Sequence, residues 1–212
     1  MSHPSSGRTS TEMKIGIASD AHCNVAALQT AVDEMAPVVD EILFAGDAVY
    51  EYRMSNEIVD LIRTTGMHYV LGNHEIELLS PGGVRAREAE GVRQDALDYL
   101  STLPYRVDLD IDGKHLVMVH GSPFPPYNDY VTKGSVALRR CGDVDADFLV
   151  IGHTHVPLTE RVNGTLVVNP GSIGESREHG FKDLVSYAIL DTTTEEVEFV
   201  KFPNPRLAGT PA

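Results

Sequence analysis

Residues 13–22 read MKIGIASDAH, and their pattern indicates the fold class. The first seven are apolar or small and, after Lys14, uncharged, which is typical of a strand buried on both faces of a parallel sheet. Residues 25–35, VAALQTAVDEM, follow with apolar side chains at helical spacing, and Asn24 is placed to cap that helix. A buried strand that leads directly into an amphipathic helix predicts the start of a parallel α/β sheet.

The same alternation continues through the first third of the chain. Strands are predicted at residues 41–45 and 68–71, with a helix at residues 55–64 between them. Consecutive strands that are linked by helices form a parallel sheet with crossover connections.

The rest of the chain is richer in strands. Asp112-Gly113 and Asn163-Gly164 each separate two apolar runs, which is a strong hairpin signal. Helices are predicted within 84–103 and 133–141, and strands at 105–111, 115–119, 148–151, 156–162, 165–168, 185–190 and 197–202. We therefore expect an α/β fold of two packed, mixed β-sheets with helices outside them.

The length and composition are those of one soluble globular domain, since the 212 residues are 42% hydrophobic and 23% charged. We predict a disordered leader at residues 1–12, a single domain at residues 13–203 and a flexible tail at residues 204–212. No apolar run approaches the roughly 18 residues of a membrane span, so no membrane partner is expected. Two cysteines, Cys23 and Cys141, are too few for a disulfide framework, which favours a reducing, cytoplasmic setting.

The formal net charge of −14 bears on the partners of this protein. A surface of this sign repels a polyanionic backbone, so long duplex nucleic acid is a poor partner. Solubility is the simplest reason for the acidity. Bound divalent cations would still make a site on this surface locally positive.

Residues of metal-binding type follow the predicted strands, at the edge where ligands bind in open α/β sheets. They are Asp20, His22, Asp47, Asn73, His74, His120, His153 and His155. Residues two apart in an extended chain point to the same side, so Asp20 and His22 are expected to hold one ion together. The same spacing predicts that His153 and His155 share an ion. The adjacent Asn73 and His74 should diverge, one toward metal and the other toward substrate.

The ligand set combines carboxylate, amide oxygen and imidazole, with no thiolate. This composition suits manganese, iron, zinc, cobalt or nickel rather than a structural zinc site. Asp47 carries two carboxylate oxygens and could bridge two ions. A glycine that lets the backbone turn sharply stands beside several of the candidates, at Gly46, Gly72, Gly121 and Gly152.

These residues fall into ordered blocks: Asp20-Ala21-His22, Gly46-Asp47, Gly72-Asn73-His74-Glu75, His120-Gly121 and Gly152-His153-Thr154-His155. In this order they resemble the calcineurin-like metallophosphoesterases, and Asn169-Pro170-Gly171-Ser172 matches a further block of the small bacterial phosphodiesterase-like branch. The resemblance extends from about residue 13 to residue 202. It implies a four-layer αββα sandwich and a dinuclear-metal hydrolase of phosphodiesters or phosphomonoesters of small molecules, such as nucleotides.

The resemblance also implies a role for each residue. One ion would be held by Asp20, His22, Asp47 and His155, and the other by Asp47, Asn73, His120 and His153. His74 would protonate the leaving oxygen, while a hydroxide between the metals would attack phosphorus in line. Two ions about 3.5–4 Å apart stabilise the attacking and the leaving oxygen, and a metal lowers the pKa of its water from 15.7 to about 7. Two divalent ions are expected, manganese before iron, zinc, cobalt or nickel.

The sequence departs from the superfamily's protein Ser/Thr phosphatases after the second block. Those enzymes have Asp-Arg-Gly where this chain has Tyr50-Glu51-Tyr52. The acid that would orient His74 is therefore expected to be missing, and an acidic residue replaces the phosphate-binding arginine. This argues against a phosphoprotein phosphatase. Cys23 and Phe124 also replace a glycine and an arginine that relatives often carry, so the substrate contacts should differ.

Several interpretations stay open. Arg177, His179 and Tyr127 are candidate substrate contacts. The aromatic side chains of Phe124, Tyr127 and Tyr130 either stack on a base or an aryl group or pack their own loop. Cys23 is either a small buried residue or a redox-sensitive thiol.

Two other functions also stay open. The first is a non-catalytic protein-interaction scaffold, the role of a retromer subunit with this fold; the complete ligand set disfavours it. The second is a nuclease acting on ends or single strands, which the acidic balance disfavours.

Overall fold

The computed structural model describes residues 13–207; the leader predicted at residues 1–12 and the last five residues of the predicted tail lie outside that range. Its first sheet has the strand order β10-β9-β1-β2-β3. The strands are β1 Lys14–Ala18, β2 Glu41–Phe44, β3 His68–Tyr69, β9 Leu184–Asp191 and β10 Val197–Pro203. The first three strands run parallel, while β9 pairs antiparallel with both β1 and β10, so the sheet is mixed.

The second sheet has the order β4-β5-β6-β8-β7. Its strands are β4 Arg106–Ile111, β5 Lys114–Val119, β6 Phe148–Val150, β7 Leu158–Val162 and β8 Thr165–Asn169. The β4-β5 and β7-β8 pairs are antiparallel hairpins, as the two Asx-Gly dipeptides predict, and β5, β6 and β8 run parallel in the middle.

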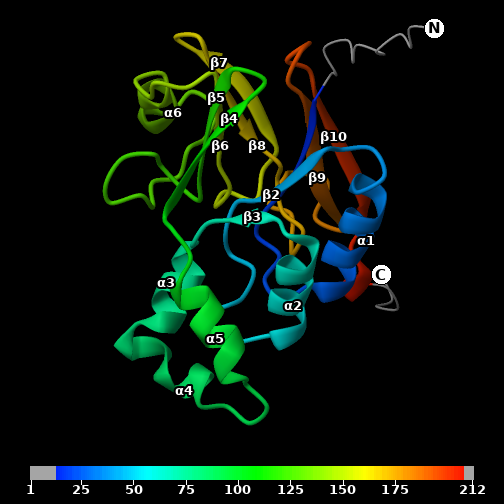
Figure 1. The fold of residues 1–212 in the computed structure, drawn as a ribbon, viewed down its shortest axis with the longest axis vertical. Helices are drawn as coiled ribbons and strands as arrows, with labels where there is room; N and C mark the ends of the chain where they lie inside the picture. The colour runs from blue at the N-terminus through cyan, green and yellow to red at the C-terminus, as the bar shows by residue number, and fades with distance from the viewer. Residues whose placement is uncertain (1–12, 208–212) are drawn as a thin grey trace, which may run out of the picture.

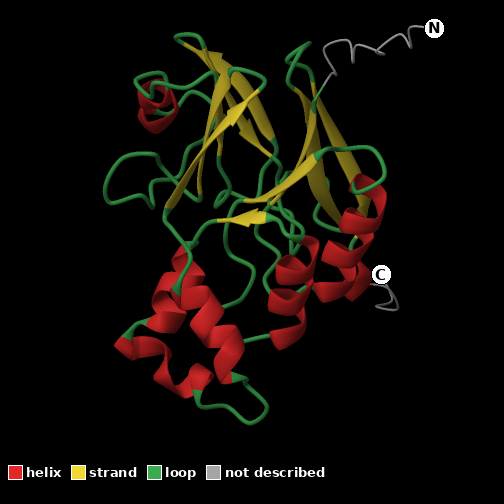
Figure 2. Cartoon of the chain, viewed as in Figure 1, coloured by secondary structure: helices red, strands yellow, loops and turns green. Residues whose placement is uncertain are grey.

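The helices lie outside the two sheets or at one end of them (Figure 1, Figure 2). They are α1 Val25–Met35, α2 Asn56–Thr65, α3 Asn73–Leu79, α4 Val84–Arg87, α5 Gln94–Ser101 and α6 Val136–Cys141, with short 3₁₀ turns η1 Pro81–Gly83 and η2 Pro205–Leu207. The single helix predicted within residues 84–103 is split into α4 and α5, and Gly91 in the connection takes a left-handed φ of 84°. The two-turn helix α3 was not predicted, because seven residues give little periodic signal.

Three hydrophobic clusters fill the spaces between the layers. Ile17, Leu43 and Phe148 belong to the cluster between the two sheets. Leu28 and Ile62 belong to the cluster that joins the first sheet to its helices, and Leu138 of α6 packs on the outer face of the second sheet. The order helix, sheet, sheet, helix confirms the predicted αββα sandwich.

The predicted flexible tail needs correction at residues 204–207. Asn204 is buried, and its side chain donates to the carbonyl oxygen of Gly174 at 2.8 Å and accepts from Asn24 at 3.0 Å. These two bonds fix the segment against the loop before α1 and lead into η2. Within residues 13–207, no helix is long and apolar enough to cross a membrane.

Candidate metal centre

The eight predicted site residues come together where the strands end. Asp20 and His22 follow β1, Asp47 follows β2, and Asn73 and His74 begin α3 after β3. His120 follows β5, while His153 and His155 follow β6, so each sheet contributes ligands. The first two loops are bonded to each other, since the backbone N–H of Asp20 donates to Gly46 at 2.9 Å and that of His22 to Asp47 at 3.0 Å.

One group of potential ligands consists of Asp20, His22 and His155, all of them buried. The Nε2 atoms of His22 and His155 are 3.0 Å apart, and Nε2 of His155 lies 3.3 Å from Asp20 Oδ1. His155 Nδ1 donates to the carbonyl oxygen of Glu175 at 2.9 Å. This bond places the ring proton on Nδ1 and leaves the Nε2 lone pair directed at the other two residues.

A second group consists of Asp47, His120 and His153. His120 Nε2 lies 3.1 Å from Asp47 Oδ2, 3.2 Å from His153 Nδ1 and 3.1 Å from Asn73 Oδ1. The carbonyl oxygen of Ala45 accepts from His120 Nδ1 at 2.7 Å, so this ring also keeps Nε2 for the centre of the site. Asp47 belongs to a third group as well, with His22 and His74, and therefore lies between the two main groups.

The expectation that His153 and His155 hold one ion together is wrong, because His153 joins the second group and His155 the first. The prediction assumed an extended chain, whereas both residues have left-handed φ values, 69° and 59°. Asp20, His22 and Asp47 are left-handed too, at 54°, 48° and 58°. Such a conformation costs a non-glycine residue of order 1–3 kcal/mol and is concentrated at functional sites. Asp20 and His22 nevertheless share a group, as predicted.

The electrostatics of the site favour a bound cation. Burial raises the pKa of the Asp20 carboxyl, but the neighbouring histidines, His155 foremost, bring it well below its usual range. Asp20 Oδ1 is buried without a hydrogen-bond partner among the described residues, which an anionic oxygen tolerates only beside a positive charge. Burial lowers the pKa of His22 and of His153 to about 4, so both rings are neutral and offer lone pairs at neutral pH.

The surroundings of His120 also favour a positive charge. Burial lowers the pKa of its ring, but the carboxylates of Asp47 and Asp20 outweigh that effect and raise the pKa to about 10. A proton on His120 thus compensates the buried carboxylates, as a divalent cation between the same groups would. The donor set of carboxylate, amide and imidazole fits such an ion.

The expectation that no acid orients His74 is wrong, because Glu51 takes that position. The Glu51 carboxylate accepts a short hydrogen bond from His74 Nδ1. His74 Nε2 then faces the site, 3.7 Å from Asp47 Oδ2. The aspartate of the Ser/Thr phosphatases would stand at position 50, and Glu51 stands one residue later. Because glutamate is one carbon longer than aspartate, its carboxylate still reaches the His74 ring.

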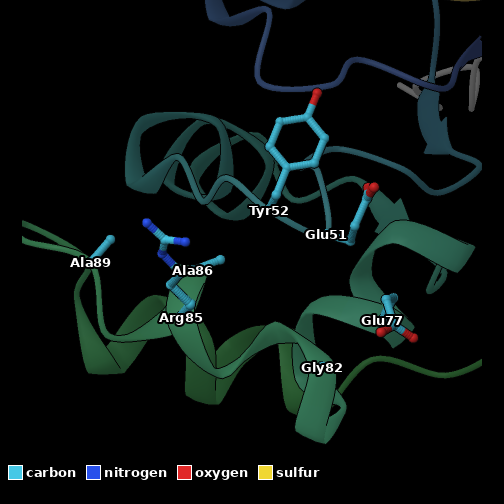
Figure 3. A pocket seen from close by; sticks show the side chains of 7 residues that line it. All are labelled: Glu51, Tyr52, Glu77, Gly82, Arg85, Ala86 and Ala89. Carbon is cyan, nitrogen blue, oxygen red and sulfur yellow. The ribbon is translucent and has the colours of Figure 1, made fainter.

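Glu51 also lines a cavity of about 490 Å³ on its other side, which Figure 3 shows between the loop after β2 and the helices α3 and α4. Its other lining residues are Tyr52, Glu77, Gly82, Arg85, Ala86 and Ala89. Tyr52 stacks on Tyr50, which in turn stacks on the ring of His22, with centroids 4.9 and 4.6 Å apart. Glu51 therefore stands between this cavity and the ring of His74.

Glu75, which stands in the block at residues 72–75, holds two ligand loops in position, a role that no prediction above gave it. Its wholly buried carboxylate accepts from the backbone N–H groups of Asp47 at 2.8 Å, Val49 at 3.1 Å and Gly72 at 2.8 Å. It thereby ties the loop after β2 to the start of α3. Glutamate at the third position of a helix is a capping-box signal, and that signal could have identified it.

The block at residues 169–172 supports the ligand loops. Asn169 donates to the carbonyl oxygen of Gly152 at 2.6 Å, and Ser172 donates to that of Asp20 at 2.8 Å. Gly72 leaves no room for a side chain, because a Cβ there would lie 2.0 Å from Asp47 Oδ1.

The candidate substrate contacts lie in different places. Arg177 lines a cavity of about 470 Å³ beside the first ligand group. Tyr127 lines a small cavity of about 40 Å³ together with Asn73 and His120. His179 is exposed and lines neither of these cavities.

The structure bears on the interpretations left open for the aromatic residues 124, 127 and 130 and for Cys23. Phe124 packs under the guanidinium of Arg140, and Tyr130 lies against the ring of His153 with centroids 4.1 Å apart. Phe124 therefore packs its own loop, whereas Tyr127 and Tyr130 are 41% and 55% exposed and remain open to a ligand. Burial raises the pKa of the Cys23 thiol, which favours a structural residue over a reactive thiolate.

Known proteins resemble this chain in sequence and in fold. An uncharacterized protein of Methanocaldococcus jannaschii is 26% identical over 88% of this chain and 86% of its own length. The crystal structure of a metallophosphoesterase from Sphaerobacter thermophilus superposes with a TM-score of 0.74 at 28% identity, covering 94% of this chain and 95% of the other.

A hypothetical protein of Pyrococcus horikoshii shares the fold, with a TM-score of 0.70 at 18% identity over 90% of this chain and 88% of its own. The family model for the calcineurin-like phosphoesterase superfamily domain matches residues 13–195, which is most of the chain and includes every ligand candidate. The chain therefore belongs to the calcineurin-like phosphoesterase superfamily.

Proposed function

We propose that this protein is a metal-dependent phosphoesterase that hydrolyses phosphodiester or phosphomonoester bonds of small molecules. The observation that carries this proposal is the pair of buried ligand groups, Asp20-His22-His155 and Asp47-His120-His153, with Asp47 between them. Two divalent ions, manganese first, would be held by these groups, with Asn73 as an additional oxygen ligand. When bound, the ions supply Lewis-acid activation of water and of the phosphoryl oxygens.

The protein's own contribution to the reaction is proton transfer by His74. The hydrogen bond from Nδ1 to Glu51 fixes the ring, so that Nε2 faces the reacting group. A proton held at Nε2 can pass to the leaving oxygen, and a positioned general acid of this kind typically contributes 10²- to 10⁴-fold.

Hydrolysis of p-nitrophenyl phosphate and of bis-p-nitrophenyl phosphate, with added Mn²⁺ and bound metal quantified, tests the proposal. We expect turnover of at least one ester. Asp47→Asn should reduce it by orders of magnitude, and His74→Ala should do so for esters with poor leaving groups. Failure to hydrolyse either ester with metal bound would instead favour the scaffold. Full activity of Asp47→Asn with these esters, or of His74→Ala with an alkyl ester such as glycerol phosphate, would contradict the assigned roles.

A further inference from the structure

The cavity that contains Arg177 lies next to the loops that carry the first ligand group. Its volume is about 470 Å³. The backbone of Glu175, one of its lining residues, holds His155 Nδ1 at 2.9 Å. Another, Arg206, donates from its guanidinium to the carbonyl oxygen of His22. Two of the residues that line the cavity are therefore hydrogen-bonded to members of the first ligand group.

Three cations line the cavity: Arg177, Lys182 and Arg206. They face one carboxylate, Glu175, although the whole chain has 17 Lys and Arg against 31 Asp and Glu. The local balance of charge is thus the reverse of the overall balance. A basic cleft in an otherwise acidic surface concentrates anions, because the remaining surface repels them.

Two of these cations lack the partners that most others in this protein have. Arg93 pairs with Asp60, Arg106 with Asp108, and Lys201 with Glu178. Within residues 13–207, neither the Arg177 guanidinium nor the Lys182 ammonium makes a side-chain hydrogen bond or ion pair. Glu175 lies in the same cavity, but its carboxylate is contacted by the Tyr50 hydroxyl, at 3.5 Å. Both cations are therefore available to an anion from solution.

Hydrogen bonds connect the wall of the cavity to the loop that carries Asp20. Asn204, which also lines it, donates to the Gly174 carbonyl oxygen at 2.8 Å, and the Gly174 N–H donates to that of Asp20 at 2.8 Å. A Cβ on Gly174 would lie 2.7 Å from the same Asp20 oxygen. This close packing fixes the distance between the ligand loop and the loop that carries Arg177.

We propose that this cavity is a second phosphate subsite, bound by Arg177, Lys182 and Arg206. It implies that the preferred substrates carry a further phosphoryl group beside the ester that is cleaved, as a nucleoside bisphosphate ester does. Guanidinium and ammonium groups that converge on one side of a phosphate supply charge-assisted hydrogen bonds, and arginine can do so with two parallel bonds. The inference rests on the proposed function for the ester at the metal groups.

Two esters that differ only in the second phosphate test the subsite: thymidine 5′-p-nitrophenyl phosphate and its 3′-phosphorylated derivative. Both release p-nitrophenol from the same 5′ position. We expect the 3′-phosphate to raise kcat/KM about tenfold or more, since a hydrogen bond between charged groups contributes at least that factor. The double variant Arg177→Gln/Lys182→Gln should bring the ratio of the two kcat/KM values close to one.

The control variant is Lys133→Gln, which removes one positive charge from an 83% exposed side chain outside the cavity and should leave the ratio at the wild-type value. Calorimetric titration without added metal gives a second measurement, the affinity for thymidine 3′,5′-bisphosphate relative to thymidine 5′-phosphate. We expect the bisphosphate to bind more tightly to the wild type and to lose that advantage in the double variant.

Turnover of both esters with a ratio near one in the wild type would overturn the subsite and leave the proposed function intact. A ratio that the double variant does not change would also overturn it. Turnover of neither ester would count against the proposed function instead, and the titration would still decide whether the second phosphate is bound.

Discussion

Replacing Glu51 with glutamine should slow the hydrolysis of esters whose leaving group needs a proton. The Glu51 carboxylate contacts His74 Nδ1, and no other described side chain holds this nitrogen. Glutamine preserves the size of the side chain and removes its charge. The variant therefore tests whether the charge holds the His74 ring in position for proton transfer.

The structure sets the size of the effect. Hydrogen bonds to charged groups contribute about 1.5–3 kcal/mol. The Glu51 side chain is 37% exposed and that of His74 22%, so water screens the interaction and the lower end applies. A loss of about 1.5 kcal/mol in the transition state lowers kcat about tenfold. His74→Ala removes the acid itself and should cost about 10²- to 10⁴-fold.

The assay compares two leaving groups under Mn²⁺. Glycerol phosphate, followed by phosphate release, has an alkoxide leaving group that must be protonated. p-Nitrophenyl phosphate, followed by absorbance, releases an anion that is stable without a proton. We expect the loss with the first substrate and almost none with the second.

Glu77→Gln is the matched control, because Glu77 lines the same cavity without contacting His74. An equal loss of kcat for both substrates in Glu51→Gln would refute the reasoning, since it would place Glu51 in substrate or metal binding. The same loss in Glu77→Gln would refute it too, because a general change in the cavity charge would then explain the effect.

Three further predictions concern stability. Glu75→Ala leaves three buried N–H groups without their acceptor, at about 1–3 kcal/mol each, so urea denaturation should show a loss of at least about 3 kcal/mol; a loss below about 1 kcal/mol would contradict the role of Glu75. Mn²⁺ at 100 times its dissociation constant should stabilise the protein by about 2.7 kcal/mol, a rise in Tm of about 5–10 °C that Asp47→Asn should reduce sharply; an equal rise in that variant would place the ion elsewhere. The pKa of His120 is raised to about 10 in the folded state, so its proton stabilises the fold fully below about pH 6.5 and is lost as the pH rises toward 10. The metal-free protein should therefore lose stability between these pH values. A His120→Gln variant whose stability falls with the same slope in denaturation experiments would exclude His120 as the cause.

The local sequence determined the fold class and most of the elements. Buried strands such as β1 are continuous apolar runs, and the Asx-Gly turns at residues 112–113 and 163–164 specify their hairpins because few other residues adopt the left-handed conformation there. The identity of the ligands was also local information, since it depends on residue type and on position after a strand.

The family resemblance implied the division of the ligands between two groups, whereas spacing along the chain did not. The two-residue spacing predicted that His153 and His155 share an ion, but the structure, with left-handed backbone at both residues, places them in different groups. That conformation is maintained by contacts from distant segments, among them the bond from Asn169 to the Gly152 carbonyl oxygen. A pattern read along the chain does not contain these contacts.

The same limit applies to the groups around the metal centre. Glu51 and His74 are 23 residues apart, and Arg177 and Arg206 come from separate loops, yet the fold brings each pair to one cavity or one hydrogen bond. Residue types and their order thus determined what chemistry this protein can support. Only the packing of the two sheets, which sets the distances between their loops, decided which side chains act together.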